Sequence, residues 1–270
     1  FLQLSQPTSD PKVRALQKKY LPKTRQLVLA AQWAENPYST QKCDSDLDGD
    51  ESLECVLSNS SLFLILSPLG GRIELAVACE QAHCMQWIGT TAQYSFGLSD
   101  PDTWNLTDPV APDPEVIPGA LVDSNNPSQV YIVGSLPGEI QFQSPDSKTR
   151  KVIRLNPTGF SVEINSSQPS TYSFPILLSS GMGSTNSWAD GFLSTVQDST
   201  IMWGFPPGNL VGINISNATY QFESFKSIRM LMQKPENPDF FYEPLFFKPF
   251  PLALLNVGPS THWSVDFSIH

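Results

Sequence analysis

Residues 53–78 read LECVLSNSSLFLILSPLGGRIELAVA and contain three short apolar runs, at 53–58, 62–67 and 72–78. The segments between these runs, Asn59-Ser60-Ser61 and Pro68-Leu69-Gly70-Gly71, consist mostly of residues that favour turns. Runs of six or seven residues bounded by turns are typical of buried β-strands rather than of helices. This stretch therefore predicts three consecutive strands joined by tight turns.

The same pattern of short runs and turns continues to the end of the chain. Apolar and polar residues alternate most clearly at 151–155 and 264–269. Many short strands with turns about every eight to twelve residues indicate an antiparallel sandwich or barrel, and we expect an all-β fold built as an antiparallel β-sandwich. The further expected strands are 94–98, 129–133, 139–144, 151–155, 160–164, 172–178, 200–205, 210–215, 220–225, 252–257 and 263–269.

The N-terminal part of the chain differs, because residues 11–36 have helical periodicity. Pro11 and Pro22 each suit the first turn of a helix, and Asn36-Pro37 ends the pattern. We expect a short helical hairpin or kinked helix, whose second part presents an apolar face. The sequence thus divides into an N-terminal helical segment, 1–40, and a β-sandwich domain, 41–270. The expected apolar face comprises Leu27, Ala30, Ala31 and Ala34.

The composition excludes some classes of function. Charged residues make up 16% of the 270 residues and the net charge is −10, so the chain lacks the clustered positive charge that nucleic-acid binding requires. Residues 1–25 are the exception, with six basic residues against one acidic residue. This segment is expected to dock on an acidic surface of its own domain or of a missing neighbour; a solvated helix face is the alternative.

The four cysteines and the glycosylation sequons point to an oxidising compartment. The close spacing of Cys43 with Cys55 and of Cys79 with Cys84 favours two local disulfides, although four cysteines allow three pairings. A Cys₄ zinc site is the alternative, and these spacings fit it poorly. With no apolar run long enough to span a membrane, we expect a secreted glycoprotein, extracellular or at the cell surface. The sequons are Asn59, Asn105, Asn165, Asn214 and Asn217.

Between Cys43 and Cys55 lie six acidic side chains within eleven residues. Like charges this close repel unless a cation lies among them, and carboxylates at alternating positions suit Ca²⁺. A register that starts at Asp44 places Gly49 at the glycine position of an EF-hand loop, but it lacks the final glutamate. The preferred register starts at Asp46 and runs into a strand, with Glu51 at the position where glycine is usual. The loop predicts a structural Ca²⁺ site; a hydrated acidic turn is the alternative. The candidate ligands are Asp44, Asp46, Asp48, Asp50 and Glu54.

No set of catalytic residues can be assigned from the sequence. The three histidines lie far apart, no Gly-x-Ser-x-Gly motif is present, and paired carboxylates cannot be recognised by spacing alone. Aromatic residues near expected loops suggest a face that stacks on sugar rings; core packing is the alternative for them. The candidates for stacking on a glycan are Trp104, Trp188 and Trp203.

Several segments resemble the C-terminal β domain that follows the catalytic domain in bacterial glycoside hydrolase family 57 proteins, relatives of α-amylase and amylopullulanase. Turn-flanked strands of this type also resemble the galactose-mutarotase-like supersandwich. The resemblance spans roughly residues 41–270. The matching segments are Asp46-Leu47-Asp48-Gly49-Asp50, Glu54-Cys55-Val56-Leu57-Ser58-Asn59, Leu62-Phe63, Ser67-Pro68-Leu69-Gly70-Gly71-Arg72-Ile73, Gly97-Leu98-Ser99-Asp100-Pro101, Ile117-Pro118-Gly119-Ala120 and Pro249-Phe250-Pro251-Leu252.

The resemblance implies an accessory module without an active site. Family 57 enzymes are retaining α-glycosidases whose catalytic Glu and Asp reside in an N-terminal (β/α) barrel, and nothing in this sequence matches that barrel. The expected function is therefore a non-catalytic module that is stabilised by Ca²⁺ and binds glycans. Its expected partner is a catalytic or helical region that precedes it, or other protein subunits. The alternatives are a structural subunit of an extracellular complex with no sugar role, and a fragment of an α-glycan-active enzyme.

Overall fold

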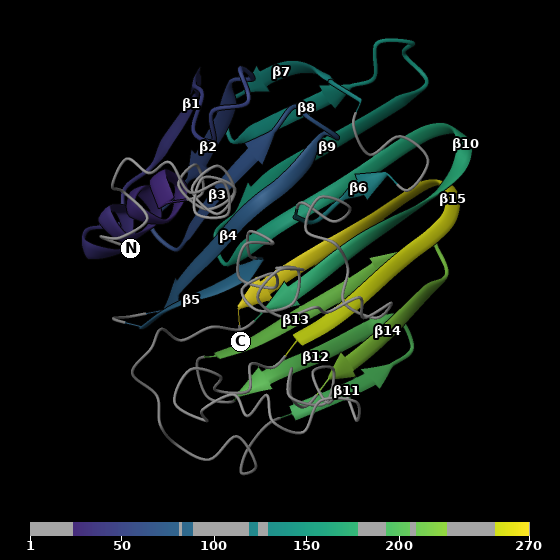
Figure 1. Cartoon of the computed structure of the whole chain (residues 1–270). Helices are drawn as coiled ribbons and strands as arrows, with labels where there is room; N and C mark the ends of the chain where they lie inside the picture. Colours follow the sequence, from purple (N-terminus) through teal and green to yellow (C-terminus); the bar gives the residue numbers. More distant parts are fainter. Residues whose placement is uncertain are drawn as a thin grey trace, which may run out of the picture.

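The computed structural model describes residues 24–80, 83–88, 119–123, 129–177, 193–205, 209–225 and 252–269. In these residues the chain forms two antiparallel β-sheets and one short helix, at 24–35 (Figure 1). The prediction of an all-β sandwich preceded by a helix is confirmed. The expected strand at 94–98 lies outside the described residues, and so does the first part of the expected helical hairpin.

The smaller sheet contains five strands in chain order, each antiparallel to the next. The three strands expected from residues 53–78 form its centre, and two strands that were not expected form its edges. The first edge strand is polar and half exposed, so it carries little apolar signal. The strands are β1 (Thr40–Ser45), β2 (Glu54–Ser58), β3 (Leu62–Ser67), β4 (Arg72–Glu80) and β5 (His83–Ile88).

The larger sheet contains ten strands, and its main path follows the order β11-β12-β13-β15-β10-β9-β8-β7. The two remaining strands pair at its centre, β14 with β15 and β6 with β10. The strands are β6 (Val122–Asp123), β7 (Ile132–Leu136), β8 (Glu139–Gln143), β9 (Thr149–Asn156), β10 (Gly159–Leu177), β11 (Leu193–Gln197), β12 (Thr200–Phe205), β13 (Asn209–Ser216), β14 (Tyr220–Phe225) and β15 (Leu252–Ile269).

Two long strands, β10 and β15, form the centre of the larger sheet (Figure 1). They pair along most of their length, from Gly159 opposite Ser268 to Leu177 opposite Leu252. Each had been expected as two separate strands. The register shifts where the expected strands were divided, between Asn165 and Tyr172. A β-bulge interrupts the ladder there without ending the strand.

The main core lies between the two sheets. Apolar side chains of β2–β5 meet those of the larger sheet in one buried cluster. Within it the rings of Phe160 and Phe267 stack with centroids 4.7 Å apart. Lys151 is also buried there, and its ammonium group donates to the carbonyl oxygens of Gly70 and Leu121 at 2.5 and 2.9 Å. The large sheet thus turns one face to this core and the other away from the small sheet.

The helix covers the outer face of the small sheet. Its buried positions are Gln26, Ala30 and Trp33, which are spaced four and three residues apart and so share one face. Of the expected apolar face, Ala30 is buried, whereas Ala31 is exposed. The expectation for Ala31 was wrong because Gln26 and Trp33 shift the buried face around the helix. The division into segments 1–40 and 41–270 stays a prediction, and the basic residues at 12–23 lie outside the described residues.

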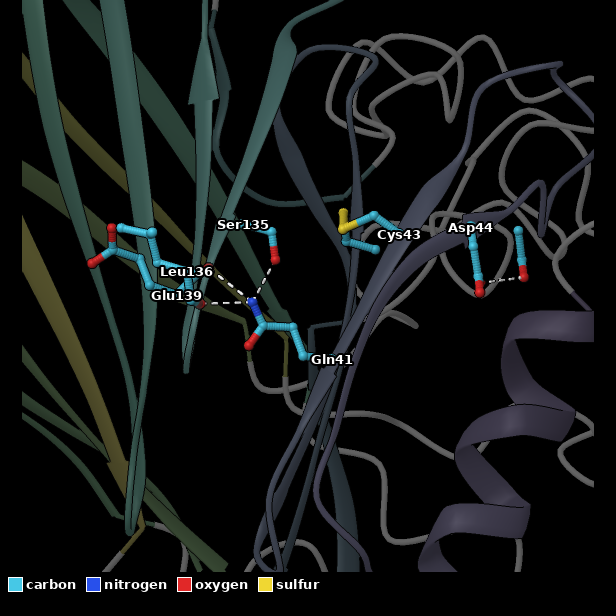
Figure 2. Close-up of a disulfide and its surroundings, with 8 residues drawn as sticks. Gln41, Cys43, Asp44, Ser135, Leu136 and Glu139 are labelled. Atoms are coloured by element: carbon cyan, nitrogen blue, oxygen red, sulfur yellow. Dashed lines mark hydrogen bonds between the residues drawn. A yellow bond between two sulfur atoms is a disulfide. The ribbon is translucent and has the colours of Figure 1, made fainter.

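One glutamine joins the edges of the two sheets. Figure 2 shows Gln41 of β1 reaching the turn between β7 and β8. Its side-chain nitrogen donates to Ser135 Oγ at 2.6 Å and to the carbonyl oxygens of Leu136 and Glu139 at 2.7 and 3.2 Å. Its side-chain oxygen accepts a hydrogen bond from the backbone N–H of Gly138 at 2.9 Å. Gln41 therefore fixes the first strand of the small sheet against the large one.

We expect Gln41→Ala to lower the free energy of unfolding by about 1–2 kcal/mol, because the hydrogen bonds are partly exposed and each contributes only modestly. Lys42→Ala, at the exposed neighbouring position, is the matched control and should change stability by less than about 0.5 kcal/mol. Urea denaturation followed by tryptophan fluorescence measures both values. Equal stabilities of the two variants would show that the glutamine does not join the sheets.

Candidate functional site

Both expected disulfides are present in the structure. Cys43 of β1 pairs with Cys55 of β2, and Cys79 of β4 pairs with Cys84 of β5. A Cys₄ zinc site is therefore ruled out, because all four sulfur atoms are bonded in disulfides. The first disulfide joins the two strands near the loop end of the β1–β2 hairpin, and the acidic residues form the tip of that hairpin.

Three of the candidate metal ligands lie together in this tip. Asp46, Asp48 and Asp50 each offer a carboxylate oxygen, and these oxygens lie within 4.8 Å of one another. Ligand oxygens about 2.3–2.6 Å from a Ca²⁺ ion can be up to about 5 Å apart, so the grouping fits this ion. Backbone groups of the loop also donate to these carboxylates: Gly49 N–H donates to Asp46 at 2.6 Å, and Ser52 N–H donates to Asp50 at 2.8 Å.

The other two candidate ligands lie outside this group. Asp44 accepts a hydrogen bond from the hydroxyl of Ser45 at 2.9 Å. Glu54 is 1% exposed, and one of its oxygens accepts the backbone N–H of Leu47 at 2.6 Å. Glu51 adopts φ +71°, a left-handed conformation that favours glycine, at the position where calcium loops usually have glycine.

Glu54 also lies near a buried ionic group under the helix. Arg72 of β4 donates to Glu74 through Nη2 at 2.7 Å, and Gln26 of the helix donates to the other oxygen of Glu74. Burial raises the pKa of Glu54 to about 8, and the negative charges of Asp48, Glu74 and Asp50 add to this shift. The second oxygen of Glu54 has no hydrogen-bond partner within the described residues. Glu54 is thus a proton-holding residue beneath the acidic loop.

Of the three aromatic residues proposed to stack on glycans, the structure describes one, Trp203. Trp203 lies on β12 and is completely buried in the main core, so its ring cannot face a sugar. That expectation was wrong because Trp203 falls at an inward position of its strand rather than in a loop. Trp104 and Trp188 lie outside the described residues.

The sequons differ in how accessible their side chains are. Asn59 is half-buried, and its amide donates to the carbonyl oxygen of Asn156 at 2.9 Å. Asn165 is half-buried and hydrogen-bonded on the large sheet, and Asn105 lies outside the described residues. Asn214 and Asn217 are exposed. Among the sequons that the structure describes, these last two are therefore the most accessible.

The outer face of the large sheet carries a continuous polar surface that was not expected. The strand registers place three rows of residues across β8, β9, β10 and β15, and two of these rows extend to β13. The residues in these rows are polar except for Val152, which is fully buried, and the alternate residues of the same strands point into the core. The rows are Glu139, Arg154, Ser161, Asp266 and Asn214; Gln141, Val152, Glu163, Ser264 and Ser216; and Gln143, Arg150, Asn165 and His262.

A hollow of about 260 Å³ lies in this polar face, at β9, β10 and β15. Arg154 bonds both Glu139, at 2.5 Å, and Glu163, at 2.9 Å. The pKa of the Glu139 carboxyl is lowered by hydrogen bonds from Gln141 and Arg154, and that of Glu163 by the bond from Arg154. Asn165 donates to Glu163 at 3.1 Å and contacts Nδ1 of His262 at 2.6 Å. The hollow is lined by Arg154, Ser161, Val162, Glu163, His262, Ser264 and Asp266.

These features define a β-sandwich in which a five-stranded sheet packs on a ten-stranded sheet, with a disulfide-closed acidic loop at one edge. No family model matches the chain, and no curated protein sequence matches it. Among solved structures, the chain is similar to the 4-alpha-glucanotransferase from Thermococcus litoralis, with a TM-score of 0.53 and 13% identity over 92% of this chain and 42% of that one. The chain and part of that enzyme therefore share a fold.

A second solved structure is the heparan sulfate lyase HepC from Pedobacter heparinus, with a TM-score of 0.47 and 8% identity over 97% of this chain and 42% of that one. The chain thus spans less than half the length of either enzyme. Within the described residues, no helix is both long enough and apolar enough to cross a membrane.

Proposed function

We propose that this chain is a non-catalytic β-sandwich accessory module of a glycoside-hydrolase-like protein, and that it binds glycans. The observation that carries the proposal is the fold that it shares, over 92% of its length, with part of a 4-alpha-glucanotransferase. The sequence resemblance to a β domain of family 57 proteins supports the same function. In this role the module acts beside a catalytic region on another part of the protein.

Binding and turnover experiments test this function. We expect the chain to bind at least one glycan on a glycan array and to leave maltooligosaccharides uncleaved after prolonged incubation. Binding to no glycan would favour the alternative, a structural subunit of an extracellular complex. Cleavage of maltooligosaccharides by this chain alone would contradict the non-catalytic role and favour an α-glycan-active enzyme.

We further propose that Asp46, Asp48 and Asp50 hold a structural Ca²⁺ ion. The grouping of their oxygens within 4.8 Å supports this role. The ion would offset the repulsion among the carboxylates and join the loop to the small sheet. Leu47 of the same loop packs beneath the helix, with Ala30 and Trp33. Such an ion stabilises the fold and takes no part in a reaction.

Removal of Ca²⁺ is expected to destabilise the chain. At a free Ca²⁺ concentration a hundred times the dissociation constant, the bound ion stabilises the folded state by about 2.7 kcal/mol, so excess chelator should lower the melting temperature by several degrees. Asp48→Ala should abolish this sensitivity, whereas the control Asp44→Ala should retain it, because Asp44 lies outside the group. Equal sensitivity in both variants, or none in the parent chain, would favour the hydrated acidic turn.

We also propose that the chain is secreted. Two disulfides suit an oxidising compartment. Of the four sequons within the described residues, Asn217 is best placed for a glycan, because it is exposed in the turn between β13 and β14 and lies outside the polar rows of the large sheet. Expression in a eukaryotic secretory host, followed by mass spectrometry of peptides that contain Asn217, tests this assignment.

A further inference from the structure

The hollow in the polar face of the large sheet offers hydrogen-bond acceptors, and its one guanidinium group, of Arg154, is already paired with two carboxylates. Asp266 accepts no hydrogen bond from the described residues, and burial raises its pKa. Because Asn165 donates through Nδ2 to Glu163, its Oδ1 is the acceptor for His262 Nδ1. In the neutral imidazole of His262, Nε2 is then the acceptor. Both acceptors line the hollow.

The hydroxyl groups of Ser161 and Ser264 line the same hollow. Each hydroxyl can both donate and accept a hydrogen bond. The arrangement therefore suits a ligand that presents many hydroxyl groups, since each ligand hydroxyl can donate to Asp266 or His262 and exchange hydrogen bonds with the serines. The polar rows continue beyond the hollow across five strands, so an extended ligand would meet further polar groups.

The charges around the hollow select against an anionic ligand. Its lining holds one guanidinium group, of Arg154, against the carboxylates of Glu163 and Asp266. Arg154 is already bonded to Glu139 and Glu163, so it has little capacity to neutralise a sulfate or carboxylate. An anionic ligand would also approach a chain with a net charge of −10.

We infer that this hollow, between Arg154 of β9, Glu163 of β10 and Asp266 of β15, binds one residue of a neutral oligosaccharide. The inference rests on the proposed glycan-binding function and names its site and its ligand class. The volume of about 260 Å³ is slightly below the range of about 300–1,000 Å³ usual for small-molecule pockets. One sugar ring therefore occupies the hollow, and its neighbours in the oligosaccharide lie along the polar rows.

Calorimetric titration of the full chain from a host without N-glycosylation tests the site. Such a host is needed because glycans on Asn165 or Asn214 would stand on the same face. The probes are maltoheptaose, cellohexaose and a heparin hexasaccharide. We expect at least one neutral probe to bind and the heparin probe to show no binding at the same concentrations.

Asp266→Asn should weaken the binding of the neutral probe at least tenfold, because the amide keeps the shape but removes the strongest acceptor. Asp198→Asn is the matched control, with the same charge change at an exposed turn between β11 and β12, where φ +52° suits asparagine. This control should leave affinity unchanged. Equal affinity of the two variants for the neutral probe would overturn the site while leaving a glycan-binding function in place.

Two further outcomes separate the inference from the function on which it rests. Binding of the heparin probe alone would overturn the neutral ligand class but support a glycan-binding module. Failure of all three probes, together with an empty glycan array, would overturn the glycan-binding function itself.

Discussion

Trp33→Ala is expected to lower the free energy of unfolding by about 3–5 kcal/mol, the range for deletion of a large buried aromatic side chain. Trp33 is completely buried, and its ring lies 5.5 Å from that of Phe63, centroid to centroid. It belongs to the second core, which holds the helix on the small sheet. Its indole N–H also donates to the carbonyl oxygens of Tyr38 and Asn59, at 3.1 Å each.

Two further variants separate the contributions to this effect. Trp33→Phe keeps most of the apolar contact and removes both hydrogen bonds, so we expect a smaller loss of about 1–2 kcal/mol. Val28→Ala, at a position 48% exposed on the same helix, is the control and should cost less than about 0.5 kcal/mol. If urea denaturation gave Trp33→Ala a loss as small as that of Val28→Ala, the helix would not depend on this contact.

The central strands of the small sheet were predictable from the sequence because runs of apolar residues there coincide with burial, whereas the edge strand β5 was missed although Met85, Trp87 and Ile88 are buried. β3 has six consecutive buried residues, and its bounds were predicted correctly. The edge strand β1 could not be recognised, because it is held by β2, the Cys43–Cys55 disulfide and Gln41 rather than by apolar burial. Near Asn165 and Tyr172 the prediction divided one strand into two, because polar residues interrupt the apolar pattern there while the strand continues through a bulge.

The candidate sites were predictable only where they are local in sequence. Asp46, Asp48 and Asp50 fall within five residues, so their spacing alone indicated that they would meet. The polar face joins Glu139, Arg154, Ser161 and Asp266, which are separated by up to 127 positions and meet only through strand register. The alternation at 264–269 showed that one side of that strand is polar. It could not show which strands lie beside it.

Glu54→Gln should remove a large pH dependence of stability, because burial raises the pKa of Glu54 from 4.5 to about 8. Between these two pH values the folded chain keeps a proton that the unfolded chain has released. Stability therefore falls as pH rises through this window, and it is greatest below the pKa of the unfolded state. At about 1.36 kcal/mol for each unit of pKa, the loss by pH 8 is on the order of 4 kcal/mol.

The amide in Glu54→Gln can still accept the N–H of Leu47 through its oxygen, and it carries no charge at any pH in this window. The variant should match the parent chain near pH 4.5 and exceed its stability by a few kcal/mol at pH 8, both in calcium-free buffer. Glu51→Gln is the control, because Glu51 lies in the same loop and is exposed. Removing its charge should leave the slope of stability against pH unchanged. Parallel pH profiles of the parent chain and Glu54→Gln in urea denaturation would mean that Glu54 is ionised in the fold. An ionised Glu54 would then be available as a further ligand of the loop when Ca²⁺ is restored.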